Sequence, residues 1–290
     1  MPAIKIRKCD PRSGSQASWI AAVRAFRPEA TLKRDKTTVV FSGRFADRKA
    51  VIKVTDLHSP WDRLREALGL SRLHRQWRGH ETLWKVGAAT CTPFCLARTE
   101  VPGERPQSIL ALEFIPGHTL LDHLSEQDLP PSREIALAKR LGRLIAQIAL
   151  AGYRNRDCKL SNLVAVDPRS DLPQIVTLDA EGIRKARFIS PSAAAANMIF
   201  KAAVEPIGLH VKIRPALIAA VAIACAKELS REPTHRPPSQ AARALARRLI
   251  ARATAYFNAH GDPTPSIDPR RPAPHPSTNT APRANQPSSP

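Results

Sequence analysis

The chain of 290 residues has no apolar run of the length, about 20 residues, that a membrane-spanning helix needs. Its longest apolar run covers residues 216–226 after Pro215 and predicts a buried helix. The segment that follows Met1 carries charges within a few residues of each other and lacks the apolar stretch of an export signal. We therefore expect a cytoplasmic protein.

Cysteine and the aromatic residues are also in short supply. The five cysteines are an odd number spread along the chain, which argues against a disulfide framework and suits a reducing compartment. Only Cys91 and Cys95 are close in sequence, and no further ligand stands near them, which argues against a zinc site. Because aromatic residues make up only 5% of the chain, a base-stacking surface is not expected, and neither is nucleic acid as a partner.

Acidic residues are outnumbered, 25 against 45 Lys and Arg, which gives a net charge of +20. Residues 183–252 alone hold thirteen Lys or Arg against three Glu. This surplus predicts an anionic partner rather than a particular fold. Residues 261–290 are rich in Pro, Ser and Thr with little to bury, which predicts a disordered tail.

Hydrophobic periodicity and turn residues predict both strands and helices. Residues 37–41 and 50–54 have the composition of strands on either side of a turn at 43–48. Ser59 and Pro60 supply the N-cap and first turn of a helix that is expected to continue to Trp77. The remaining predicted elements are a strand at 108–114, a long helix at 132–151, a hairpin formed by 163–166 and 174–178, and helices after residue 190.

The residues with the strongest chemical signal lie between the long helix and the hairpin and directly after the hairpin. Phosphoryl transfer needs a carboxylate that accepts the proton of the attacking hydroxyl, and it needs oxygen ligands that hold Mg²⁺ against the phosphates. Asp157 is the candidate base, and Asn162 and Asp179 are the candidate metal ligands. Lys159 can neutralise charge on the migrating phosphoryl group. The alternative is that these are turn residues with local backbone bonds and the end of a strand.

With these residues in their order, residues 31–185 resemble the protein-kinase-like superfamily, and especially its branch of lipopolysaccharide core kinases that phosphorylate heptose or Kdo. The resemblance implies an α+β, bilobal fold that binds ATP and Mg²⁺. It places a small antiparallel β-rich N-lobe at residues 25–115 and an abbreviated helical C-lobe at 116–260. Residues 1–24 would then form an N-terminal extension.

The same resemblance assigns nucleotide-binding roles to further residues. The run Ala-Val-Ile-Lys that ends at Lys53 resembles the strand whose lysine holds the α- and β-phosphates. Glu66 would be the helix glutamate that pairs with this lysine, with Asp62 as the substitute and a solvated helix face as the alternative. Glu113 and Ile115 would belong to the hinge that meets adenine, although a simple strand-to-loop junction explains them equally well.

Several departures from the protein-kinase pattern leave a pseudokinase open. Asn155 stands where most kinases carry histidine, and residues 180–182 replace the usual Phe-Gly after the metal-binding aspartate. The first turn, residues 33–36, has bulky side chains in place of glycines that let the backbone approach phosphate. No Ala-Pro-Glu motif or recognisable activation segment follows, so that regulation of the ordinary protein-kinase kind is not expected.

The last predicted helix separates apolar from basic residues. Leu245, Leu249, Ala253 and Phe257 are four residues apart on one face, and Arg243, Arg247, Arg248 and Arg252 stand elsewhere around it. The arginines are either solvated charges or a surface for peripheral contact with anionic lipid, or with a phosphorylated glycan, at the inner face of a membrane.

These observations favour an ATP-dependent kinase that phosphorylates a hydroxyl. The resemblance and the basic surface favour a sugar of a lipopolysaccharide-type glycolipid as the anionic acceptor. Two alternatives remain open. One is a Ser/Thr protein kinase, and the other is a catalytically silent scaffold whose basic face binds nucleic acid or a membrane.

Overall fold

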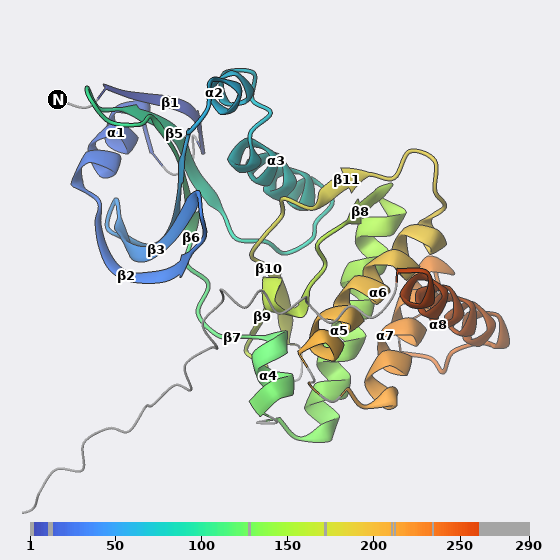
Figure 1. Ribbon diagram of the computed structural model, residues 1–290. Coiled ribbons are helices and arrows are strands. Elements are labelled where there is room, and N and C mark those ends of the chain that lie inside the picture. Colours follow the sequence, from blue (N-terminus) through green and yellow to red (C-terminus); the bar gives the residue numbers. More distant parts are fainter. Residues whose placement is uncertain are drawn as a thin grey trace, which may run out of the picture.

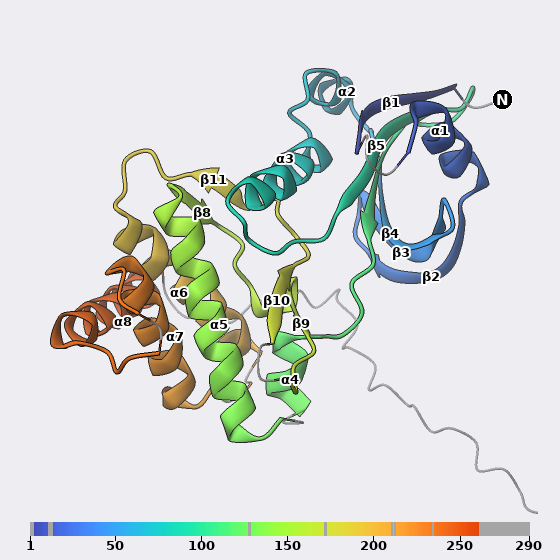
Figure 2. The same ribbon diagram turned by 180° about the vertical axis from the view of Figure 1, so that it is seen from behind.

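A six-stranded antiparallel sheet dominates the first half of the chain (Figures 1 and 2). The structure is a computed structural model, and it describes residues 3–10, 14–126, 129–170, 173–209, 211, 213–233 and 235–260. The sheet has the strand order β1-β5-β6-β4-β3-β2. Its strands are β1 (Ala3–Cys9), β2 (Arg27–Arg34), β3 (Thr38–Phe45), β4 (Arg48–Asp56), β5 (Pro93–Glu100) and β6 (Gln107–Glu113).

Residues expected as an N-terminal extension are part of this sheet. β1 pairs antiparallel with β5, and α1 (Gln16–Ala25) follows it. Trp19 of α1 is buried between Phe45 and Phe94, with ring centroids 5.5 Å and 6.0 Å away. Stacked aromatic rings of this size contribute much of the buried apolar area in a small lobe. The first 24 residues therefore include a strand and a helix of the N-lobe itself.

The predicted hairpin of the N-lobe is present with a tighter turn than expected. β3 and β4 pair antiparallel from Thr38 with Thr55 to Phe45 with Arg48. Only Ala46 and Asp47 connect them, and both have positive φ angles, 49° and 61°. A two-residue turn with two positive φ angles matches the twist of an antiparallel pair.

Two helices replace the single helix expected from Ser59 to Trp77. α2 (Pro60–Ala67) begins with a capping box in which Ser59 and Asp62 exchange hydrogen bonds. The chain then turns at Gly69, whose φ is +68°, and Ser71 caps the second helix, α3 (Arg72–Lys85). A positive φ of this kind is open to glycine without steric cost, so the break is encoded locally.

The C-lobe is helical, with two small sheets at the side that faces the N-lobe (Figure 1). The long helix and the hairpin predicted from the sequence are both found here, as α5 and as β9 with β10. The C-lobe elements are β7 (His118–Thr119), α4 (Leu120–Glu126), α5 (Pro131–Leu150), β8 (Tyr153–Asn155), the 3₁₀-helix η1 (Leu160–Asn162), β9 (Leu163–Val166), β10 (Gln174–Thr177), β11 (Ile183–Lys185), α6 (Pro191–Gly208), α7 (Pro215–Leu229) and α8 (Gln240–His260).

The apolar run at 216–226 lies in α7 and contributes to the C-lobe core, as predicted. On α8, Leu249 is buried and Leu245 and Ala253 pack against that core, whereas the side chain of Phe257 lies outside the described residues. The four arginines of α8 are exposed. The predicted tail at 261–290 also lies outside the described residues. None of the helices that the structure describes is both long enough and apolar enough to span a bilayer.

The two lobes meet where α3 packs on the segment after β10. A Cβ atom on Gly79 of α3 would overlap the carbonyl oxygen of Ala180, which directly follows Asp179. In the C-lobe, a Cβ atom on Gly142 of α5 would overlap the carbonyl oxygen of Val221 in α7. Both glycines therefore allow a close approach of two backbones.

We predict that Gly79→Ala loses both stability and nucleotide affinity. Alanine gains about 1 kcal/mol in helix propensity, but overpacking against a backbone atom costs up to about 3 kcal/mol, so that a net loss of about 2 kcal/mol is expected. Gly142→Ala is the matched control, since it should lower stability without lowering the ATP affinity of the folded protein. Urea unfolding and ATP titrations of both variants make the comparison. If Gly79→Ala unfolds in urea like wild type and binds ATP with wild-type affinity, the packing described here is contradicted.

Candidate active site

A cavity of about 640 Å³ lies between the lobes. In the N-lobe, β2, β3 and β4 form part of its wall, and α3 also contributes side chains. The C-lobe supplies the residues after β10 and in η1. The residues predicted from the sequence that line it are Lys53, Glu113, Ile115, Asn162 and Asp179.

One ion pair joins the lobes across this cavity. Nζ of Lys53 on β4 lies 3.1 Å from Oδ2 of Asp179, which directly precedes the packing contact at Ala180. Both side chains are largely buried, with 16% and 18% of their surface exposed. Lys53 Nζ also donates to Oε1 of Gln76 on α3 at 3.1 Å. The lysine is thus held by one charged and one neutral oxygen.

Asp179 is kept ionised by its neighbours although it is buried. Burial, the largest single influence, would raise the pKa of this carboxyl, but the charge of Lys53 and the backbone N–H of Glu181 outweigh it. The pKa of Asp179 therefore lies below its usual value. Glu181 N–H donates to Oδ1 at 3.0 Å. An ionised carboxylate at this place suits a hard cation such as Mg²⁺.

The carboxylate of Glu181 anchors the same segment to α3. It accepts hydrogen bonds from Nε of Arg72 and from Nη2 of Arg75, the second at 2.7 Å. Arg72 also lines the cavity. Charge-assisted bonds of this kind are stronger than neutral ones, so that the position of Asp179 is linked to the position of α3.

The loop between β8 and η1 brings the other predicted polar residues together. Asn162 Nδ2 donates to Oδ2 of Asp157 at 3.1 Å, and Nζ of Lys159 lies 3.1 Å from Oδ1 of the same carboxylate. The Asp157 backbone N–H donates to Oδ1 of Asn155 at 3.0 Å. Asn155 is buried, and a Cβ on Gly182 would overlap its Oδ1. Asn155 thus shapes the loop in the place where most kinases have histidine.

The oxygen atoms present fit a Mg²⁺ ion and its phosphate ligands. The amide nitrogen of Asn162 is engaged by Asp157, which leaves its oxygen available for a cation. The carboxylate of Asp179 supplies a second oxygen in the same cavity. Mg²⁺ binds through one or two protein oxygens and substrate phosphates rather than through a closed protein cage.

The structure does not bring Glu66 to Lys53. Glu66 is fully buried in α2, and its Oε2 lies 3.4 Å from Nδ1 of His74. Burial alone would raise the pKa of Glu66, but the polar side chains of His74 and Ser71 beside it hold it below its usual value. Because the chain breaks at Gly69, the helix that reaches Lys53 is α3, and it presents Gln76 instead. The predicted substitute, Asp62, is engaged in the cap of α2.

Sequence reasoning missed Gln76, although a signal for it exists. Gly69 followed by Ser71 is a helix stop followed by an N-cap, which separates α2 from α3. Counting from Ser71 places Gln76 on the buried side of α3. His80, one turn further on, is also buried; burial lowers its pKa to about 3, so that it is neutral and adds no charge beside Lys53.

The hinge residues and the first turn also border the cavity. Oε2 of Glu113 accepts a hydrogen bond from the backbone N–H of Thr92 at 3.1 Å, so this carboxylate fixes the end of β6. Ile115 lines the cavity and packs against a cluster that includes Leu73. Lys33, near the end of β2, forms an ion pair of 3.4 Å with Asp35 in the turn that follows. Lys33 and Asp35, rather than glycines, line the cavity there.

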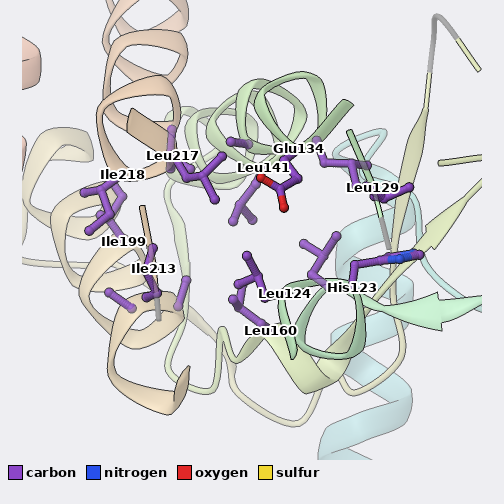
Figure 3. A pocket seen from close by; sticks show the side chains of 16 residues that line it. His123, Leu124, Leu129, Glu134, Leu141, Leu160, Ile199, Ile213, Leu217 and Ile218 are labelled. Atoms are coloured by element: carbon purple, nitrogen blue, oxygen red, sulfur yellow. The ribbon is translucent and has the colours of Figure 1, made fainter. Parts of the chain in front are cut away.

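A second cavity lies within the helical lobe and has a different chemistry (Figure 3). Leucine, isoleucine and alanine side chains from α4, α5, α6 and α7 line most of it. Glu134 points its carboxylate toward this space (Figure 3). Arg214 forms an ion pair with this carboxylate. None of the described residues that line it provides the paired carboxylate, amide and lysine groups of the cleft, so the cleft is the candidate active site.

The comparisons with known proteins support the fold. The chain is similar in structure to WaaP. The matching solved structure is described as WaaP in complex with acyl carrier protein, and the similarity covers 88% of this chain and 99% of that one with a TM-score of 0.54. At 15% sequence identity it shows the fold alone. No family model matches the chain, and no curated protein matches it either.

The α+β, bilobal protein-kinase-like fold predicted from the sequence is thereby confirmed. The similarity to WaaP extends across both lobes, because 88% coverage leaves out fewer residues than either lobe contains. The roles of individual site residues rest on the geometry of the cleft.

The Lys53–Asp179 pair predicts a pH-dependent stability difference. The pKa of Asp179 lies below its usual value of 3.8, so the pair stabilises the fold above about pH 4 and loses this contribution as pH falls through the lower, folded pKa. Lys53→Met leaves a buried carboxylate without its counter-charge, which should cost about 3 kcal/mol at pH 7.

Urea unfolding at pH 7 and at successively lower pH measures this difference. The gap between wild type and Lys53→Met should narrow as Asp179 becomes protonated. Lys49→Met removes the same charge from an exposed position of the same strand and should show a small, pH-independent change. A gap for Lys53→Met that is equally large at pH 3 and pH 7 would refute the assignment.

Proposed function

We propose that this protein is an ATP-dependent kinase that transfers the γ-phosphate to a hydroxyl of a lipopolysaccharide-type glycolipid sugar. The observation that carries the proposal is the pairing of Lys53 with Asp179 in the same cavity as Asn162. These groups supply a cation and two oxygen ligands at the place where the lobes meet. The arrangement suits a nucleotide triphosphate with its metal ion.

Each side chain has a distinct task in this reaction. Lys53 binds the α- and β-phosphates, and Asn162 and Asp179 hold the Mg²⁺ ion, which when bound neutralises phosphate charge. Asp157 accepts the proton of the attacking hydroxyl while that oxygen bonds to the γ-phosphorus and the bond to ADP breaks. Lys159, 3.1 Å from Asp157, lies where it can stabilise charge on the transferred group.

The acceptor class is supported by the resemblance to lipopolysaccharide core kinases and by the charge of the chain. The similarity of fold to WaaP agrees with this branch. A net charge of +20 favours an anionic acceptor, and the exposed arginines of α8 supply a surface for peripheral contact with anionic lipid. A glycolipid at the inner face of a membrane meets both requirements.

We predict that tight ATP binding requires a divalent cation. The cleft has no glycine-rich turn to bind the phosphates through backbone N–H groups, and its bulky first turn cannot substitute for them. Calorimetric titration should therefore show at least a tenfold loss of affinity when EDTA replaces Mg²⁺. Equal affinity under both conditions would remove the metal role of Asn162 and Asp179.

The two aspartates should respond differently to the same substitution. Asp157→Asn keeps the shape but removes the base, so it should retain Mg-ATP affinity while turnover falls by roughly a hundredfold or more. Asp179→Asn replaces a charged metal ligand by a neutral oxygen and should weaken both Mg-ATP binding and turnover. ATP consumption with glycan acceptors, and nucleotide binding for each variant, give the two readouts.

Asp167→Asn is the control for both variants. Asp167 is exposed in the turn between β9 and β10 with a φ of 49°, a conformation that asparagine also tolerates. It should bind Mg-ATP and turn over like wild type. Full activity of Asp157→Asn on an acceptor that wild type phosphorylates would show that the base is misassigned. ATP turnover that is the same in wild type and Asp157→Asn with every acceptor would favour the scaffold alternative.

A further inference from the structure

Five arginines lie around the loop between β8 and η1, which carries Asp157. They have no role in the proposed transfer of phosphate. Two come from α3, two come from β8 and the residue after it, and one comes from β11. None of the five lines the nucleotide cavity. They are Arg75, Arg78, Arg154, Arg156 and Arg184, and we call them the arginine cluster.

The backbone brings like charges face to face in this cluster. Arg154 and Arg184 are direct partners in the antiparallel pairing of β8 with β11, so their side chains leave the same face of the two strands. The backbone N–H of Arg156 donates to the carbonyl oxygen of Gly182 at 2.9 Å, which holds Arg156 at the end of this strand pair. Like charges directly opposite each other destabilise a strand pair.

The charges of other arginines in the cluster act on Arg184. Burial is the main reason that the pKa of Arg184 lies below its usual value. The positive charges of Arg75, Arg156 and Arg78 lower it further. Glu181 is the acid that opposes them, and its carboxylate already accepts hydrogen bonds from α3. The cluster therefore has more positive charge than the acid beside it can balance.

Two donors of the cluster also lack a partner. Nε of Arg75 and Nε of Arg154 are buried and make no hydrogen bond within the part of the chain that the structure describes. A buried donor without a partner costs free energy, and a bound oxyanion would remove that cost. Guanidinium groups bind phosphate and carboxylate oxygens with two parallel hydrogen bonds. The ligand that fits this cluster is therefore an oxyanion.

The position of the cluster identifies the side of the reaction that it serves. Arg156 directly precedes Asp157, and a Cβ on Gly182 would lie 2.7 Å from the Asp157 backbone nitrogen. The nucleotide phosphates are assigned to Lys53 and Asp179 in the separate cavity. An anion held by the cluster would thus belong to the molecule that presents its hydroxyl to Asp157.

In the described segment between β11 and α6, the chain offers no available hydroxyl side chain that could be phosphorylated and then bind to the cluster. Only residues 186–190 connect these elements, and the serine among them, Ser190, caps α6 by accepting from Ala193 N–H at 3.3 Å. We propose that the arginine cluster is an acceptor subsite that binds a phosphate or carboxylate group of the acceptor beside the hydroxyl to be phosphorylated. The role as an acceptor subsite rests on the proposed kinase function, but anion binding itself does not.

Calorimetric titration of the full chain with inorganic phosphate, glucose 6-phosphate and uncharged glucose tests the proposal. Wild type should bind the first two and not glucose. Arg154→Gln/Arg184→Gln should weaken phosphate binding roughly tenfold or more, because two charge-assisted partners are lost. Arg24→Gln/Arg169→Gln removes the same charge from exposed positions on α1 and in the turn between β9 and β10, and it should bind like wild type.

A second readout covers the case in which the double variant folds poorly. Phosphate should raise the melting temperature of wild type, raise that of Arg154→Gln/Arg24→Gln by less, and leave that of Arg154→Gln/Arg184→Gln unchanged. Unweakened phosphate binding in the cluster variant, or an equal loss in the Arg24→Gln/Arg169→Gln control, would overturn the proposal. Failure of Mg-ATP binding with intact phosphate binding would count against the kinase function alone.

Discussion

The ion pair between Lys53 and Asp179 is the contact on which the candidate site depends. It joins two residues from different lobes, and each would be a buried charge without the other. The surrounding structure is arranged to keep the pair in place. Gln76 accepts a second hydrogen bond from the lysine, the N–H of Glu181 donates to the aspartate, and Gly79 allows α3 to lie directly on Ala180.

Charge is divided between the two sides of the catalytic loop. On the side of the proposed nucleotide site, Lys53, Asn162 and Asp179 line one cavity and suit a cation with phosphates. On the other side, the arginine cluster has more positive charge than the Glu181 carboxylate beside it can balance. Asp157 lies between these regions with Lys159 beside it. In the proposed reaction, this division separates the binding site for the nucleotide from that for the acceptor.

Local sequence signals predicted that Asp157, Lys159 and Asn162 lie together and predicted most C-lobe elements, because each depends on residues close together in the chain. The apolar runs of β9 and β10 and the long periodicity of α5 are of this kind. The pairing of β1 with β5 was missed because it joins segments about 90 residues apart and has no local pattern. Glu66 was assigned wrongly for a different reason: helical periodicity continued past Gly69, and the positive φ there rotated and separated the next helix.

Because of that break, α3 presents the neutral Gln76 to Lys53 where a glutamate was expected. Asp179 supplies the charge that stabilises Lys53, and Glu181 is used to anchor α3 through Arg72 and Arg75. Two elements thus hold Lys53 in place. Gln76 of α3 accepts a hydrogen bond from it, and Asp179 of the C-lobe forms an ion pair with it.

The central claim is that Lys53 contacts the phosphates of a bound nucleotide, and chemical labelling tests it most directly. An acyl-phosphate derivative of ATP transfers its acyl group to a lysine that lies beside its phosphates, and peptide mass spectrometry locates the modified residue. The account predicts labelling of Lys53 that depends on Mg²⁺ and is blocked by excess ATP. Labelling that is absent from Lys53, or that occurs there equally with excess ATP, would contradict it.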